Sequence, residues 1–161
     1  MDPDDPRETK KHSAAEYGGG WPGYAAARMT DEDEVLAANA AFYSAFAASD
    51  AKAMDAVWAR RAPVACVHPG WEALVGRDRV MESWRRILRG GGASPISCGS
   101  AVAHLLGEAA FVTCLERLPG ATLIATNFFV REDGRFRMVH HHAGPAARPE
   151  AAPAPPRTEL N

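Results

Sequence analysis

The stretch VHPGWEALVGRDRVMESW, residues 67–84, joins a short apolar strand to an amphipathic helix, and the rest of the chain can be arranged around it. The two parts are connected by a turn that holds His68, Pro69, Gly70 and Trp71. Proline restricts the backbone of such a turn and glycine permits unusual dihedral angles, so the loop can present side chains from a rigid scaffold. The stretch predicts a strand, a turn and a helix with a candidate binding loop between them.

Length and composition favour a single globular domain. The 161 residues, of which 47% are hydrophobic and 24% charged, suffice for one hydrophobic core. A net charge of -2 and a pI near 6.3 give no electrostatic reason to expect nucleic acid or an anionic membrane surface as a partner. Small molecules and proteins are therefore the expected partners.

Both ends of the chain are predicted to lie outside that domain. Residues 1–29 combine charged residues with prolines and three consecutive glycines, and residues 146–161 are rich in proline. Segments of this composition bury too little apolar surface to order themselves. We expect a disordered leader over 1–29, a domain over 30–145 and a disordered tail over 146–161.

The cysteines and the hydropathy pattern predict a cytoplasmic protein. Cys66, Cys98 and Cys114 are odd in number and widely spaced, without a CxxC pair, as expected of small core residues in a reducing compartment. The first 20 residues are acidic and contain proline and glycine where a signal peptide would need an apolar run, and the sequence has no run of about 18 apolar residues. We expect no membrane partner.

Helical patterns in the first half give way to alternating patterns in the second. Thr30, followed by four acidic residues, predicts the start of one helix, Asp50 caps a second, and residues 76–88 form a third. After Pro95, strands are predicted over 96–106, 109–118, 121–131 and 135–143, joined by short turns that make neighbouring strands antiparallel. The prediction is an α+β fold in which a curved antiparallel sheet wraps as a cone around three N-terminal helices, leaving an apolar cavity.

The turn Asp133-Gly134, taken as a two-residue hairpin loop, predicts the register of the last two strands. Asn127 then faces His140, on the same side as the pairs Phe129–Met138 and Ala125–His142, and Thr126 faces His141 on the other side. A β-bulge would reverse this assignment. His140 and His142 share one face and His141 points away from them.

Several side chains are candidates for chemistry or binding. His68 is the candidate for proton transfer, because imidazole titrates near neutral pH, although its ring can instead hold the turn by bonding to the backbone. The other candidate ligand contacts are Tyr43, Trp58, Trp71, Trp84, Thr126, Asn127, His140 and His142. Trp58, Trp84 and Tyr43 lie on helix stripes, where core packing also explains them.

A metal at His68, His140 and His142 is a further reading, but no acid or cysteine completes a ligand pattern, so no metal or cofactor is expected. The chain lacks GxGxxG, GxxxxGK[ST], GxSxG and HExxH, so nucleotide-binding, serine-hydrolase and zinc-protease functions have no support.

Three segments, WARRAPVACVHPGW, GRDRVMESWRRIL and ATNFFVREDGRFRMVHHHAGP, resemble the SnoaL-like branch of the nuclear transport factor 2-like superfamily. The closing VHHHAGP is also similar to the association domain of calcium/calmodulin-dependent kinase II. The resemblance implies a cone-shaped α+β barrel with an apolar pocket and a homodimer formed through the outer face of the sheet. The superfamily hosts isomerases, dehydratases, cyclases and non-catalytic binding or oligomerisation domains.

In ketosteroid isomerases of this superfamily, an aspartate before a proline is catalytic, and the resemblance places His68 at that position. The oxyanion-binding tyrosine falls at Phe42, one residue from Tyr43, and the strand acid falls near Thr126 and Asn127. These departures weaken the implication of steroid isomerisation. We expect a pocket for a small apolar or aromatic molecule, with either proton transfer by His68 in an isomerase, dehydratase or cyclase or non-catalytic ligand binding or oligomerisation.

Overall fold

The computed structural model describes residues 29–89 and 95–146. The leader and tail predicted from composition lie outside these residues, apart from Met29 and Ala146. No helix in the described part of the chain combines the length and hydropathy that a bilayer-spanning segment requires.

The three predicted helices are present as α1 (Asp31–Ala47), α2 (Ala51–Val57) and α3 (Arg77–Arg89). Thr30 caps α1 as predicted, since its hydroxyl accepts the Asp33 N–H at 3.1 Å while the Asp33 carboxylate accepts the Thr30 N–H at 3.1 Å. Asp50 caps α2 by accepting the N–H groups of Lys52 and Ala53, each at 2.9 Å. The polar side chains at these two positions therefore set where α1 and α2 begin.

The sheet has six strands: β1 (Ala65–Val67), β2 (Leu74–Val75), β3 (Ser97–Leu106), β4 (Ala109–Leu118), β5 (Ala121–Glu132) and β6 (Arg135–Pro145). Their spatial order is β2-β1-β6-β5-β4-β3, and β1 runs parallel to β6 while all other neighbours are antiparallel. The predicted meander is confirmed as β3 to β6. The short strand β2 was missed, because two residues show no alternation.

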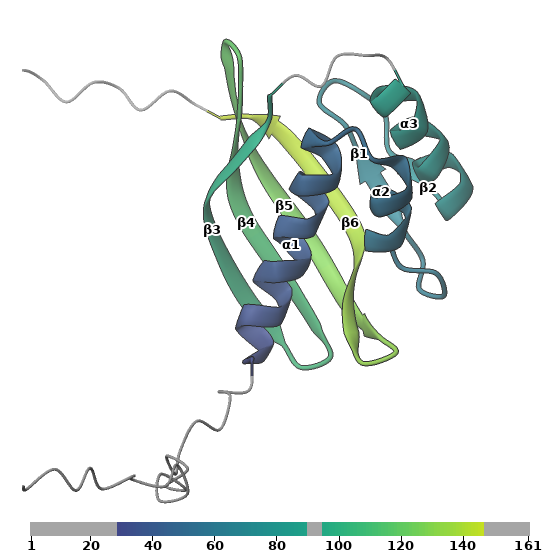
Figure 1. Cartoon of the computed structure of the whole chain (residues 1–161), viewed down its shortest axis with the longest axis vertical. Coiled ribbons are helices and arrows are strands. Elements are labelled where there is room, and N and C mark those ends of the chain that lie inside the picture. Colours follow the sequence, from purple (N-terminus) through teal and green to yellow (C-terminus); the bar gives the residue numbers. More distant parts are fainter. Residues whose placement is uncertain (1–28, 90–94, 147–161) are drawn as a thin grey trace, which may run out of the picture.

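The helices cover one face of this sheet (Figure 1), which confirms the predicted α+β class. Helix α1 packs across β3, β4 and β6, and α3 contacts β1, β2 and α2. The core lies between these layers, and its largest fully buried apolar side chains are Trp58, Trp84, Phe42, Phe129, Met54 and Met138. The opposite face of β3 to β6 has no covering helix in the described part of the chain.

The hairpin between β5 and β6 has the predicted two-residue loop, but the register changes within the strands. Asp133 and Gly134 have φ angles of 51° and 73°, as a type I′ turn requires. The pair Phe129–Met138 follows the prediction, yet the next pair is Phe128–His140, so Val139 is an extra residue in a β-bulge. Beyond it, Asn127 faces His141 and Thr126 faces His142. The predicted pairs of Asn127 with His140, Ala125 with His142 and Thr126 with His141 were therefore wrong.

Candidate active site

The loop after β1 is a tight turn that directs His68 inward. The Trp71 N–H donates to the His68 carbonyl at 2.9 Å, and Gly70, with φ of 77°, occupies the position of a type II turn that requires a positive φ. Pro69 fixes the preceding position of the turn. The His68 side chain is 5% exposed, and its ring centroid lies 4.8 Å from those of Trp71 and Trp84, edge to face.

The hydrogen bonds of His68 define which ring nitrogen carries the hydrogen atom, and its pKa defines the charge of the ring. Its Nε2 lies 2.9 Å from the Ser83 hydroxyl oxygen, and that hydroxyl donates its own hydrogen to the Val80 carbonyl at 2.8 Å. Nε2 must therefore be the donor to Ser83, which leaves Nδ1 with the lone pair. Burial, assisted by the nearby Arg86 cation, lowers the pKa of His68 to about 4, so the ring is neutral at neutral pH.

His141 is a second inward-facing histidine, held by Asn127. The Asn127 amide group donates to the Asn39 side-chain oxygen at 2.7 Å and to the Tyr43 oxygen at 3.2 Å, so its carbonyl oxygen accepts from His141 Nδ1 at 2.7 Å. This assignment leaves His141 Nε2 as a proton acceptor. Burial, with repulsion from His68 next, lowers the pKa of His141 to about 3.

Glu116 is a buried acid on β4, 3% exposed. Burial raises its pKa, and the hydrogen bond that Tyr43 donates to its Oε1 at 2.8 Å offsets only part of this rise. Glu116 Oε1 lies 3.9 Å from His141 Nε2. Burial favours the uncharged form of both groups and therefore disfavours an ion pair between them.

These groups share one cavity of about 230 Å³. Its polar lining consists of His68, Glu116 and His141, and its apolar lining consists of Phe46, Pro69, Trp71, Trp84, Ile87, Ile96, Leu118 and Leu123. Trp84 is 2% exposed, and its indole N–H has no hydrogen-bond partner among the described residues. Trp71 is 38% exposed and the Arg86 guanidinium lies 4.8 Å from its ring, so these two residues mark the solvent side of the cavity.

The candidate residues named from the sequence fall into three groups. His68, Trp71 and Trp84 line the cavity. Tyr43 and Asn127 lie beneath it, bonded to Glu116 and His141, and Trp58 is fully buried in the core beside Met138. Thr126, His140 and His142 lie on the outer face, because alternation along β5 and β6 places them opposite to Asn127 and His141.

Glu116, His141 and Ser83 are site residues that sequence reasoning missed. Glu116 follows the buried residues Val112 and Cys114 at intervals of two along its strand, so alternation places all three side chains on the same face. This spacing was a usable signal for an inward-facing acid. His141 was not among the candidates, because the sequence places His140 and His142 on the face of Met138, and the bulge at Val139 that reverses this leaves no mark in the sequence. Ser83 has no local signal, since it becomes relevant only when α3 packs against the turn.

The arrangement excludes the metal set considered from the sequence. His68 lies on the cavity side of the sheet, whereas His140 and His142 lie on the other side. Within residues 29–89 and 95–146, no three His, Cys, Asp or Glu side chains are placed to hold a metal ion.

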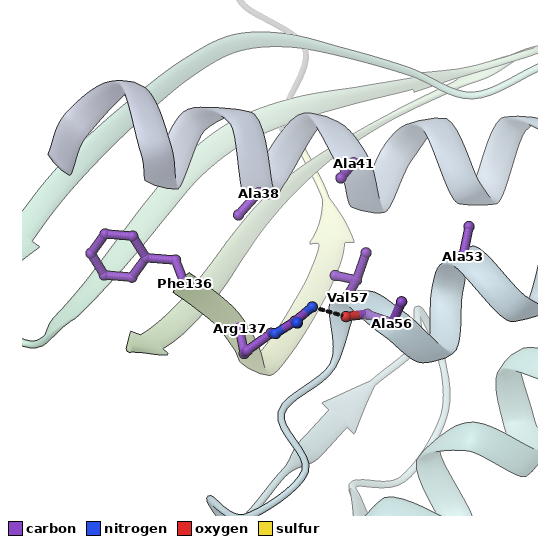
Figure 2. Close-up of a pocket in the computed structure, with 7 residues that line it drawn as sticks. All are labelled: Ala38, Ala41, Ala53, Ala56, Val57, Phe136 and Arg137. Carbon is purple, nitrogen blue, oxygen red and sulfur yellow. Dashed lines mark hydrogen bonds between the residues drawn. The ribbon is translucent and has the colours of Figure 1, made fainter. Parts of the chain in front are cut away.

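A second hollow, of about 300 Å³, lies between α1, α2 and the start of β6 (Figure 2). Its walls are Ala38, Ala41, Ala53, Ala56, Val57, Phe136 and Arg137. Arg137 is the one ionisable residue of this lining, and its guanidinium donates to the Ala56 carbonyl. The hollow therefore offers shape but no acid or base, unlike the cavity at His68.

Comparison with known proteins identifies the family. Residues 35–148 match the family model described as the SnoaL-like domain. The chain belongs to the SnoaL-like domain family. This SnoaL-like protein spans about half the length of one curated relative, an F-box protein of Arabidopsis thaliana, which is 26% identical over 126 residues, covering 77% of this chain and 53% of the relative.

Two solved structures share both fold and sequence with the SnoaL-like chain. One, from Streptomyces avermitilis and provisionally described as a dehydratase of the NTF2-like family, is 30% identical with a TM-score of 0.67, and the match covers 73% of this chain and 97% of that one. The other, from Thiobacillus denitrificans and provisionally described as a calcium/calmodulin-dependent protein kinase type II association domain, is 34% identical with a TM-score of 0.62, covering 70% and 94%. The predicted resemblance is confirmed at the level of family and fold.

Proposed function

We propose that this SnoaL-like protein is a cofactor-independent enzyme of the isomerase, dehydratase or cyclase type, acting by proton transfer on a small, largely apolar molecule. The observation that carries the proposal is a buried carboxyl group, whose pKa burial raises, and two neutral imidazoles lining one apolar cavity. An acid and a base that both start uncharged are suited to proton transfer in a site of low dielectric.

His68 is the proposed base and Glu116 the proposed acid. In a dehydration, His68 Nδ1 takes a proton from the carbon next to a carbonyl, and the carboxylic acid of Glu116 gives a proton to the departing hydroxyl group, which leaves as water. The proton on His68 then returns to Glu116 through that water, so both groups regain their starting states. In an isomerisation, the proton is returned to another carbon of the same substrate and no water is lost.

The size and lining of the cavity restrict the proposed substrate. A volume of about 230 Å³ is below the roughly 300–1,000 Å³ of drug-sized ligand pockets, which favours a molecule with a single ring. The buried indole N–H of Trp84, unpaired within the described residues, would be satisfied by a ligand oxygen. A single-ring ketone or β-hydroxyketone meets both conditions.

The test does not require the natural substrate. Single-ring ketones are incubated with the protein in deuterated buffer and followed by NMR for exchange at the carbon next to the carbonyl, and single-ring β-hydroxyketones are followed for loss of water. We expect His68→Gln and Glu116→Gln to lower the rates about 100-fold or more, and His140→Gln, on the outer face, to leave them unchanged. Equal rates in all four proteins would remove His68 and Glu116 from the chemistry.

A non-catalytic role is the second candidate, because each polar group of the cavity already has an internal partner. His68 is bonded to Ser83, Glu116 to Tyr43, and His141 to Asn127. A binding protein of this kind would be stabilised against heat by single-ring ketones and would catalyse neither exchange nor loss of water. The same variants distinguish the two functions, since His68→Gln would then alter the thermal shift alone.

We also propose a homodimer that forms through the outer face of the sheet. Val102, Leu106 and Ile124 are 52%, 58% and 48% exposed on that face. Large exposed apolar side chains that gather on one surface are typical of an interface.

The three cysteines are free thiols, which supports our proposal of a cytoplasmic protein.

A further inference from the structure

Two cysteines meet on the inner face of the sheet, outside the lining of the cavity. Cys98 on β3 is the direct register partner of Glu116, and Cys114 lies two residues from Glu116 on the same side of β4. The thiols are therefore diagonal neighbours across two adjacent strands. Each thiol shifts the pKa of the other, as expected of neighbouring groups.

The surroundings of the two thiols make them chemically different. Cys98 is half-buried and accepts a hydrogen bond from the Asn39 amide at 3.6 Å, whereas Cys114 is 1% exposed and its sulfur lies 3.1 Å from the Tyr43 hydroxyl oxygen. The hydrogen bond from Cys114, followed by the one from Asn39, lowers the pKa of Cys98 to about 7 despite burial. Its bond to Cys98 and its burial raise the pKa of Cys114. Cys98 is thus the more nucleophilic thiol.

The strand that carries Cys98 is irregular at this point. The register between β3 and β4 shifts between Gly99 and Val102, and Ser100, inside the shift, has a positive φ of 53°. A disulfide between diagonal residues needs the strands to move slightly, because cysteines in a disulfide usually have Cα atoms closer than about 7 Å. A bulge is where a sheet accommodates such a movement without losing the ladder on both sides.

We propose that Cys98 and Cys114 are an oxidation site that reacts with hydroperoxides to form an intramolecular disulfide. The Cys98 thiolate attacks the peroxide O–O bond, which gives a sulfenic acid and, with hydrogen peroxide, one water. The Cys114 sulfur then attacks the Cys98 sulfur, the S–S bond forms, and the sulfenic oxygen leaves as a second water. Two electrons pass from the two sulfurs to the peroxide, and both thiol protons end in the waters.

This oxidation would act on the floor of the cavity. Tyr43 contacts the Cys114 sulfur and donates its hydroxyl hydrogen to Glu116. Drawing the Cys114 sulfur toward Cys98 would change its contact with the Tyr43 hydroxyl group, and so would change the hydrogen bonding of the buried acid. The proposed chemistry of the thiols does not depend on what the cavity binds.

The experiment treats the reduced full-length chain with hydrogen peroxide and follows intact mass, alkylation of thiols after denaturation, and linked peptides. We expect the mass to fall by two hydrogen atoms, one of the three thiols to remain alkylatable, and the linked peptides to contain Cys98 and Cys114. Cys66 is the internal control, because it is fully buried and burial raises the pKa of its thiol to about 12.

Variants separate the two steps. Cys66→Ser should still form the disulfide, Cys98→Ser should leave Cys114 reduced, and Cys114→Ser should stop at a Cys98 sulfenic acid that dimedone captures. Circular dichroism of each reduced variant checks that it is folded. The proposal is overturned if wild-type protein keeps three alkylatable thiols while free glutathione in the same tube is oxidised, if the disulfide joins two chains, or if Cys66→Ser abolishes it.

Discussion

His141 Nε2 and Glu116 Oε1 lie 3.9 Å apart on the floor of the cavity, too far for a hydrogen bond and close enough for one oxygen atom to bond to both. An oxygen atom placed beside this pair could lie about 2.8 Å from both atoms at once. His141 Nε2, as the acceptor, and Glu116, as the acid, can thus hold a water molecule or a ligand hydroxyl group between them. Three of the five predictions below concern this floor and the supports around it.

Glu116→Gln should lose activity and gain stability above neutral pH. Burial raises the pKa of Glu116 in the folded state, so its contribution to stability is present below the unfolded pKa and is lost as pH rises through the folded pKa. Glutamine keeps the acceptor for Tyr43 and cannot ionise. We expect a higher melting temperature than wild type at pH 8, measured by calorimetry, and a lower one would contradict the assignment of a buried, raised pKa.

Asn127→Asp should raise the pKa of His141. A carboxylate in place of the amide would still accept the His141 Nδ1–H and would favour the charged imidazolium. It would also lose the donors to Asn39 and Tyr43, which costs stability. NMR titration of the His141 ring should show its pKa move upward from about 3. An unchanged titration would mean that Asn127 does not set the tautomer.

The free energy of unfolding should fall as the pH is lowered from about 6.5 to 4. Folding lowers the pKa of His68 to about 4 and that of His141 to about 3, so the unfolded chain binds more protons across this window. Each histidine contributes up to about 1.4 kcal/mol per pH unit. Urea unfolding at several pH values should give a shallower slope for His141→Gln and for His68→Gln. Equal slopes in wild type and both variants would argue against buried neutral histidines.

Ile124→Lys should dissociate the proposed dimer. Ile124 is 48% exposed on the outer face, where a charge would have to be desolvated on association. Sedimentation equilibrium should show a dimer for wild type and a monomer for the variant. Leu105→Lys is the matched control, because Leu105 is 46% exposed but its register partner is the buried Ala110, on the helix-covered face of the sheet. A wild-type monomer would remove the outer face as a self-association surface.

Glu132→Gln should destabilise the connection between α2 and β1. The Glu132 carboxylate accepts the backbone N–H groups of Arg60, Arg61 and Ala62 at 3.0, 3.0 and 2.8 Å. Burial opposes ionisation, but these hydrogen bonds together lower the pKa of Glu132, so its stabilisation is present above the unfolded pKa and is lost as pH falls through the folded one. We expect a loss of roughly 1–3 kcal/mol in urea unfolding at pH 7 and a smaller loss at pH 3. An equal loss at both pH values would show that charge is not involved.

The fold was predictable because its signals are local. Thr30 and Asp50 mark the starts of two helices, and the turns between β3 and β6 mark a meander, so the class and the confirmed boundaries follow from short segments. The parallel pairing of β1 with β6 brings together residues more than 70 positions apart. No local pattern encodes such a pairing.

The floor of the cavity was predicted less well, because it depends on one inserted residue. The bulge at Val139 shifts the register of β6 by one residue. Because side chains alternate between the two faces of a sheet, this shift moves each following side chain of β6 to the opposite face. The inward histidine is therefore His141. Glu116 was overlooked for a different reason, since a charged residue within an apolar strand usually marks the exposed face.

The three consecutive histidines of β6 serve two surfaces of one sheet, and this makes separation-of-function alleles available within a single short segment. Substituting the central histidine disturbs the interior while the flanking pair stays in place, and substituting the flanking pair alters only the exterior. If a cell tolerates one class of allele and not the other, the result shows which of the two surfaces the cell requires, even while the ligand and the binding partner are unidentified.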